Sequence, residues 1–230
     1  MSKPYGVAIG LLMPVFILAA VPAVRAEDDR PLSPAQIALF ESNHLKEIAH
    51  PVVLDYAFQH HGAPTGDFDD KVSAEIRTVH DDGRKDVWID FLTGDHHVNF
   101  PPVMDFNGNP LLMFFLEHDV NEMGAVTGGS AQYFRTRIRQ AFIDRAEMHP
   151  VQFTLAGAER SGTEIEVTPF HGDPNLARFA AFGDKTYHFI LSDAVPGTIY
   201  QISTTMPTTS GAPGLFEESM TYAGEHEDKH

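Results

Sequence analysis

The segment that decides the fold is NPLLMFFL, residues 109–116. Asn109 can cap a helix, and Pro110 is tolerated in the first turn, where its missing N–H is no loss. The six residues that follow are apolar on nearly every side of a helix, and a helix that is apolar all round is buried. We therefore predict a helix that starts at Leu111, lies inside the fold and ends near Gly124.

Further helices are predicted on both sides of this segment. Upstream, Ser33 and Gln36 form a capping-box pattern, and an apolar stripe at helical spacing predicts a helix that Pro51 ends. The stripe consists of Ile37, Phe40, Leu45 and Ile48. Downstream, a helix is predicted from Ser130 until Pro150 closes it. Its buried stripe consists of Phe134, Ile138, Ala141 and Phe142.

The remaining patterns are those of strands. Alternating apolar residues predict three strands within residues 54–58, 72–76 and 87–91, with a turn at Asp81-Asp82-Gly83. About five more are predicted within 151–155, 165–167, 187–191, 200–202 and 216–222, with a turn at Arg160-Ser161-Gly162 after the first. Segregated strands and helices are typical of the α+β class, with helices on one face of an antiparallel sheet.

This order of elements resembles the LolA-like periplasmic lipoprotein-carrier fold. The resemblance covers most of the chain after residue 26 and consists of element order alone, so no binding residue is carried over. It implies a strongly curved antiparallel β-sheet, an unclosed barrel, packed around internal helices. It also implies that this sheet shelters an acyl group.

The first 26 residues have the layout of a secretory signal peptide. Lys3 precedes an apolar run at residues 7–20, and small residues flank Arg25, so cleavage is expected after Ala26. The run is short for a membrane span, which needs about 20 residues, although an uncleaved anchor is the alternative. We expect a periplasmic protein without stable membrane anchoring, with one binding domain at residues 27–224 and a disordered charged tail at 225–230.

The charge and cysteine content of the chain exclude or disfavour several classes of binding partner. The chain has a formal net charge of −16, and Lys3 and Arg25 of the predicted leader are two of its 16 basic residues. Nucleic acid is disfavoured because its affinity depends on Lys and Arg at phosphates, and an anionic membrane surface is disfavoured for the same reason. There is no cysteine, which excludes disulfides and lipidation of the mature end.

A basic spot on this acidic chain is the first candidate site. Arg135 and Arg139 are one helical turn apart and can present two guanidinium groups to one anion. Phe114, Phe115 and Phe134 are candidates to shelter the apolar part of the same ligand. The competing interpretations are salt bridges with the chain's own acidic residues, and ordinary core packing.

Paired histidines are the second candidate site. His60-His61 and His96-His97 follow the first and third predicted strands, so both pairs fall at one end of the sheet. Acidic residues in the same loops are Asp67, Asp69, Asp70 and Asp95. Imidazole with carboxylate suits a Zn or Cu ion. The competing interpretation is exposed loop histidines.

The sequence therefore predicts an exported, non-enzymatic binding or carrier protein for an amphiphilic small molecule or acyl group with an anionic head. The alternatives are a periplasmic metal-binding protein that uses the histidine loops, and an envelope protein that binds a protein partner and no small ligand.

Glu164 and Glu166 share one face of a strand, where a solvated surface explains them. No cofactor is expected beyond the alternative metal ion.

Overall fold

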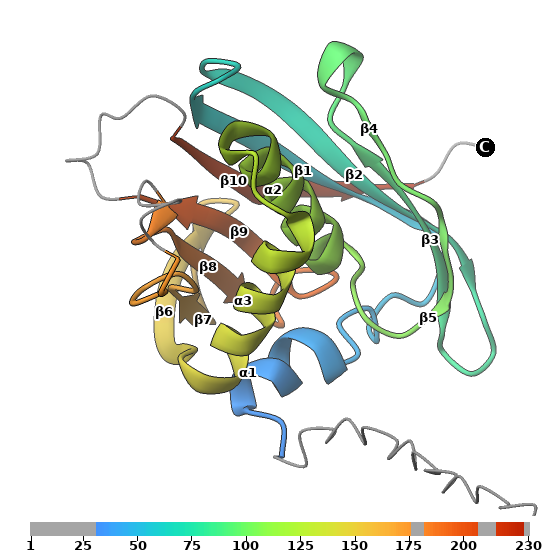
Figure 1. Cartoon of the computed structure of the whole chain (residues 1–230). Coiled ribbons are helices and arrows are strands. Elements are labelled where there is room, and N and C mark those ends of the chain that lie inside the picture. The colour runs from blue at the N-terminus through green and yellow to red at the C-terminus, as the bar shows by residue number, and fades with distance from the viewer. Residues whose placement is uncertain (1–30, 176–181, 207–214, 228–230) are drawn as a thin grey trace, which may run out of the picture. The chain divides into compact units, whose positions relative to one another are not determined.

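A computed structural model of the chain describes residues 31–175, 182–206 and 215–227 (Figure 1). The chain divides into residues 1–31 and 32–230, and the second unit holds the described elements. The predicted signal peptide and residues 228–230 of the predicted tail lie outside the described residues.

The first half of the fold consists of α1 (Pro34–Gln36), the π-helical turn η1 (Ile37–Glu41), β1 (Val52–Gly62), β2 (Phe68–Val79), β3 (Lys85–Phe91), the 3-10 turn η2 (Gly94–His96), β4 (Val98–Asn99) and β5 (Val103–Phe106). The second half consists of α2 (Leu111–Thr127), α3 (Ala131–Asp144), β6 (Glu147–Leu155), β7 (Ala158–Val167), β8 (Thr186–Leu191), β9 (Ile199–Thr205) and β10 (Phe216–His226).

All ten strands form one antiparallel sheet in the order β4-β3-β2-β1-β10-β9-β8-β7-β6, with β5 paired to β3. Its two ends do not pair with each other among the described residues, so the sheet is open. Figure 1 shows α2 and α3 crossing one face of the sheet, with β6–β9 on one side of them and β2–β5 on the other. The α+β class and the open antiparallel sheet with helices are confirmed.

Aromatic contacts fix the helices on the sheet. The Phe142 ring of α3 lies 5.6 Å from the Phe189 ring of β8, and the His118 ring of α2 lies 5.0 Å from the Phe91 ring of β3. Phe115 and Phe134 are fully buried in the same core. Side chains of the helices therefore occupy the space between helices and sheet where the sequence predicted room for a ligand.

The helix that begins at Leu111 is buried on one side rather than on all sides. Leu111, Leu112 and Phe115 are buried, but Met113 is 43% exposed. Asn109 Oδ1 accepts a hydrogen bond from the Leu111 N–H, as a capping residue does. The helix passes the predicted stop at Gly124 and ends at Gly128, whose φ of 66° is the left-handed conformation that glycine favours.

The first predicted helix is wrong in length and phase. The capping box of Ser33 and Gln36 is present, but α1 is followed at once by η1, in which the Ser42 N–H reaches the Ile37 carbonyl five residues back. This wider turn rotates the side chains that follow it. Of the predicted stripe, Leu45 and Ile48 are buried, whereas Ile37 and Phe40 are exposed, and Leu39 is buried in place of Phe40.

Three other boundaries are corrected. α3 has the predicted buried stripe but ends at Asp144, and Pro150 lies in β6, an edge strand that tolerates a missing N–H. The β6–β7 turn is at Ala156-Gly157, both with positive φ, and not at residues 160–162, which lie within β7. β10 runs to His226, so residues 225 and 226 are strand rather than disordered tail.

Candidate functional site

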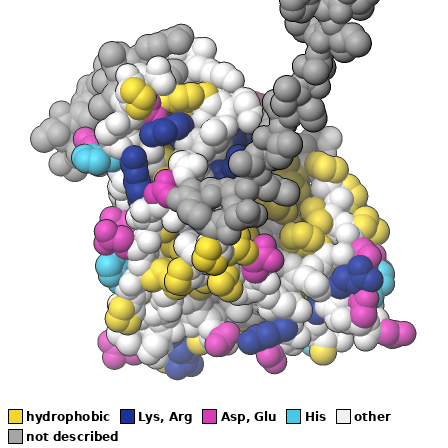
Figure 2. Space-filling view, turned by 60° about the horizontal axis from the view of Figure 1, so that its bottom comes forward, with side chains coloured by type: hydrophobic (Ala, Val, Ile, Leu, Met, Phe, Trp, Pro, Cys, Tyr) yellow, Lys and Arg dark blue, Asp and Glu magenta, His cyan; other side chains and the backbone are white. Residues whose placement is uncertain are grey.

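An apolar groove lies on the helix layer, between η1, α2 and α3. Its volume is about 380 Å³. The lining residues are Gln36, Phe40, Met113, Leu116, Glu117, Val120, Arg135, Ile138, Arg139 and Phe142. Figure 2 brings the lower side of Figure 1 forward and shows hydrophobic side chains gathered on that face between charged ones.

The local sequence explains why this groove is open and apolar. The wide turn of η1 directs Phe40 outwards, where its ring meets the Phe142 ring edge-on at 5.3 Å. Met113 is exposed because α2 has more apolar residues than its sheet-facing side can bury. Exposed apolar side chains that gather in one concave place are typical of a binding surface, whereas scattered ones are not.

Two arginines stand at the rim of the groove. Arg135 holds Glu117 of α2 in a two-pronged contact, with Nε and Nη2 at 2.8 and 2.5 Å from its two carboxylate oxygens. This hydrogen bonding lowers the pKa of Glu117. Arg139 is exposed and has no hydrogen bond or ion pair among the described residues. Both predicted arginines therefore lie at the same groove. Among the described residues Glu117 occupies Arg135, and only Arg139 is left to bind an anion.

The other arginines of this region are occupied. Arg137 forms an ion pair with Asp173 at 2.6 Å, and Arg145 donates to the His171 carbonyl at 2.5 Å. Of the four arginines between residues 135 and 145, Arg139 alone lacks a partner within the described part of the chain.

The predicted phenylalanines do not line this groove. Phe115 and Phe134 are core residues, and Phe134 meets the Phe170 ring at 5.7 Å. Phe114 is half-buried and stacks on Phe100 at 4.2 Å. The groove uses Phe40 and Phe142 instead, which the sequence analysis had assigned to the apolar stripe of the first predicted helix and to the buried stripe of the third.

The four predicted metal-binding histidines contact other residues rather than one another. His60 is buried between the rings of Phe68 and Phe216, with its Nδ1 at 3.0 Å from the Gly66 carbonyl. His61 lies 3.6 Å from Asp67 and His97 lies 3.1 Å from Asp90.

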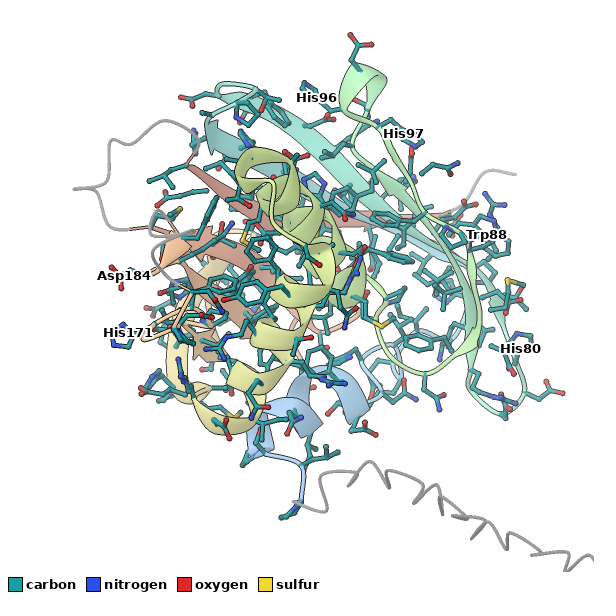
Figure 3. All side chains as sticks on the ribbon, viewed as in Figure 1. His80, Trp88, His96, His97, His171 and Asp184 are labelled. Carbon is teal, nitrogen blue, oxygen red and sulfur yellow. The ribbon has the colours of Figure 1, made fainter. Side chains whose placement is uncertain are left out.

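His96 stacks on Phe68 at 4.0 Å. Figure 3 shows His96 and His97 together at the connection between β3 and β4. In the described residues, these four imidazoles do not form a ligand set within 4.8 Å.

A buried polar network lies on the opposite side of α2, and sequence reasoning missed it. Asp119 contacts the ammonium of Lys185 and accepts a hydrogen bond from the Tyr187 hydroxyl at 2.5 Å, and the three side chains are fully buried. Burial raises the pKa of Asp119, and the Lys185 charge opposes that shift. No local pattern distinguishes Asp119 from the exposed acids nearby, because its partners lie 66 and 68 residues away.

A second ion pair continues this network. His118 Nε2 lies 3.0 Å from a carboxylate oxygen of the buried Glu218 in β10. Burial alone would lower the pKa of His118, but the Glu218 charge and hydrogen bond outweigh it, so the pKa is raised.

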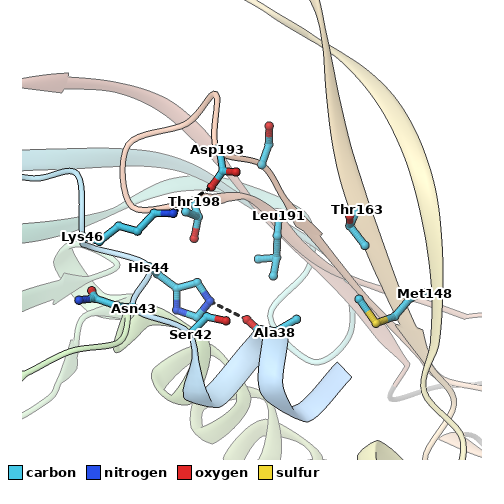
Figure 4. Close-up of a pocket in the computed structure, with 11 residues that line it drawn as sticks. Ala38, Ser42, Asn43, His44, Lys46, Met148, Thr163, Leu191, Asp193 and Thr198 are labelled. Atoms are coloured by element: carbon cyan, nitrogen blue, oxygen red, sulfur yellow. Dashed lines mark hydrogen bonds and ion pairs between the residues drawn. The ribbon is translucent and has the colours of Figure 1, made fainter. Parts of the chain in front are cut away.

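A second pocket, also of about 380 Å³, lies between the segment after η1 and the β8–β9 connection (Figure 4). Buried His44 donates from Nε2 to the Ala38 carbonyl at 2.8 Å, and burial lowers the pKa of its imidazole. The hydroxyl of Thr198 has no partner among the described residues, and Lys46 lies 3.9 Å from Asp193. These polar groups suit a small polar molecule better than an acyl chain.

No protein-family model and no curated protein matches the sequence. Among solved structures, the chain is similar to the Mycobacterium tuberculosis lipoprotein LppX, with 10% identity and a TM-score of 0.32 over 77% of this chain and 88% of that one. A DUF1329 family protein from Desulfovibrio piger matches with 8% identity and a TM-score of 0.27, over 80% and 88% of the two chains.

A LolA superfamily protein from Nitrosomonas europaea matches with 8% identity and a TM-score of 0.25, over 85% and 94% of the two chains. This agrees with the resemblance that the element order suggested. At such TM-scores the similarity carries no argument about ligand or site. None of the helices in the described residues is both long and apolar enough to cross a bilayer.

Proposed function

We propose that this protein is an exported, non-enzymatic carrier that binds a single-chain amphiphile with an anionic head. The observation that carries the proposal is the groove between η1, α2 and α3, where an apolar floor meets the guanidinium of Arg139, which has no partner among the described residues. The apolar chain would lie on Phe40, Leu116 and Val120, and the head would pair with Arg139.

Charge supports an anionic rather than a cationic head. The chain has 32 acidic and 16 basic residues, yet the arginine at this groove has no acidic partner in the part of the chain that the structure describes. A charge-assisted hydrogen bond from a guanidinium to a carboxylate or phosphate is among the stronger polar contacts. The groove volume lies in the lower part of the range of small-molecule sites, which is about 300–1,000 Å³.

Calorimetric titration with dodecanoate, below its micelle concentration, tests this function. We expect saturable binding, and about tenfold weaker binding by Arg139→Ala, since a bond to a charged group contributes about 1.5 kcal/mol or more. Arg160→Ala is the matched control, because Arg160 is an exposed arginine on β7, and it should bind like the wild type. Equal binding by Arg139→Ala, or no binding by the wild type, would contradict the proposal.

Export is part of the same proposal and has its own test. The apolar run at residues 7–20 and the small residues before position 27 support a cleaved leader. The intact mass of protein recovered from the periplasm should match a chain that begins at Glu27. A full-length mass would show that cleavage is wrong, and recovery from the cytoplasm alone would show that export is wrong. Neither result would affect the groove.

A further inference from the structure

The outer face of β7 and β8 brings two carboxylates and an imidazole together. Glu164 and Glu166 lie on β7 and His188 lies on β8, and one ligand atom of each is within 4.8 Å of the others. The alternate residues Ile165, Val167, Tyr187 and Phe189 are buried on the opposite face of the same strands. The three polar side chains therefore share the face that points away from the core.

The strand register holds this set in place. Glu166 is directly opposite His188 in the antiparallel pair. His188 Nδ1 lies 2.9 Å from a Glu164 carboxylate oxygen and 4.0 Å from one of Glu166. On its other side, His188 Nε2 lies 2.9 Å from the Thr205 hydroxyl of β9. Without a metal, Nδ1–H donates to the Glu164 carboxylate. A metal ion would replace this proton, and Nε2–H would then donate to Thr205, which is the usual support of a metal-binding histidine.

The charge balance of this face favours a cation. Two carboxylates are held close together, and no Lys or Arg pairs with either of them within the described residues. The neighbouring strand β6 adds Glu147 opposite Glu166 and His149 opposite Glu164. Arg160, the nearest arginine in sequence, lies on β7 and donates to the Glu159 carbonyl, and Arg145 donates to the His171 carbonyl. Like charges at this distance repel, and a divalent ion between them removes that repulsion.

We propose that Glu164, Glu166 and His188 form a binding site for a divalent transition-metal ion of the Zn²⁺ class. Zn²⁺ accepts imidazole nitrogen and carboxylate oxygen, and a water molecule would complete a tetrahedral set. Ca²⁺ fits less well because it takes six to eight oxygen ligands. The site is separate from the apolar groove, which is lined by residues of η1, α2 and α3 and by Gln36 of α1.

Zinc titration of the untagged, chelator-treated full chain tests the proposal, with ZnCl₂ as the probe and calorimetry as the readout. We expect His188→Ala and the double variant Glu164→Gln/Glu166→Gln to bind Zn²⁺ at least tenfold more weakly. Thr205→Val keeps all three ligands but loses the partner of Nε2, and an effect of about tenfold is expected. This variant keeps the test decisive if a ligand variant does not fold, which circular dichroism will show.

The matched control is His97→Ala, because His97 is also a histidine paired with a carboxylate. It should bind Zn²⁺ like the wild type. The proposal is wrong if the wild type does not bind Zn²⁺ below about 100 μM, or if His188→Ala and Thr205→Val bind as the wild type does. It is also wrong if the loss follows His97→Ala instead. None of these outcomes bears on dodecanoate binding.

Discussion

The two sides of α2 carry the same kind of ion pair in opposite surroundings. On the groove side, Glu117 pairs with Arg135 where both are partly exposed to water. Two residues further on, Asp119 pairs with Lys185 where both are fully buried. Removing one partner of a buried ion pair lowers the free energy of unfolding strongly, whereas an exposed pair contributes little to it. The comparison teaches that the buried side of α2 holds the fold, and that the groove side is free to serve binding.

The largest effect should come from breaking the buried pair. Lys185→Ala leaves the Asp119 carboxylate without its cation, and we expect a loss of about 3–5 kcal/mol in the free energy of unfolding. Urea denaturation followed by circular dichroism measures it, with Lys71→Ala on the exposed face of β2 as control. The double variant Asp119→Leu/Lys185→Met should recover most of the loss. If Lys185→Ala lowers the free energy of unfolding by less than about 1 kcal/mol, the buried pair does not stabilise the fold more than the exposed pair does.

The second buried pair predicts a pH dependence. Because the folded state raises the pKa of His118, this group adds stability that is fully present below the unfolded pKa of about 6.5 and is lost as the pH rises through the folded-state value. His118→Gln should therefore cost about 1–3 kcal/mol at pH 6 and less at pH 9. Denaturation of both proteins across this range measures the difference. If the stability lost in His118→Gln grows as the pH rises, the direction assigned to the pKa shift of His118 is wrong.

On the groove side, Phe40→Ala should separate binding from stability. Phe40 is 39% exposed and contributes an edge-on ring contact, so the free energy of unfolding should fall by about 1 kcal/mol. Dodecanoate binding should weaken about tenfold because part of the apolar floor is lost. Ile37→Ala, on the same turn and 49% exposed but outside the groove lining, is the control. Equal effects of the two variants on binding would exclude this groove.

The smallest effect on stability is expected at Glu117. Glu117→Gln removes the anion that occupies Arg135, and the free energy of unfolding should change by less than about 1 kcal/mol. Dodecanoate should bind severalfold more tightly, because a second guanidinium becomes available beside Arg139. Calorimetry measures the affinity, and Glu159→Gln on β7 is the control. Weaker binding by Glu117→Gln would show that the Glu117–Arg135 ion pair is needed for the groove to bind dodecanoate.

Several features of this fold were predictable because they depend on neighbours in sequence. The stripe of α3 was predicted correctly, since its period is that of a regular helix. The stripe before β1 was predicted only in part: Leu45 and Ile48 are buried, but the π-helical turn η1 changes the phase and leaves Phe40 exposed. That exposure creates part of the groove, so a local departure from the regular period decided where the candidate site lies.

The candidate sites needed contacts that sequence spacing does not contain. Arg139 was predicted as a ligand-binding residue, but the occupation of Arg135 by Glu117 depends on how α2 and α3 pack. Glu164 and Glu166 were placed on one face by strand alternation. Their partner His188 depends on the β7–β8 register, and neither strand alone specifies it.

Photo-crosslinking tests the central claim about the groove most directly. A fatty acid with a diazirine near its chain end, bound to the protein and activated by light, should label peptides that contain Phe40, Met113 or Leu116. Mass spectrometry identifies the labelled peptides, and Arg139→Ala should reduce the label. Labelling confined to the strands of the sheet, or labelling of the groove that Arg139→Ala leaves unchanged, would contradict the account.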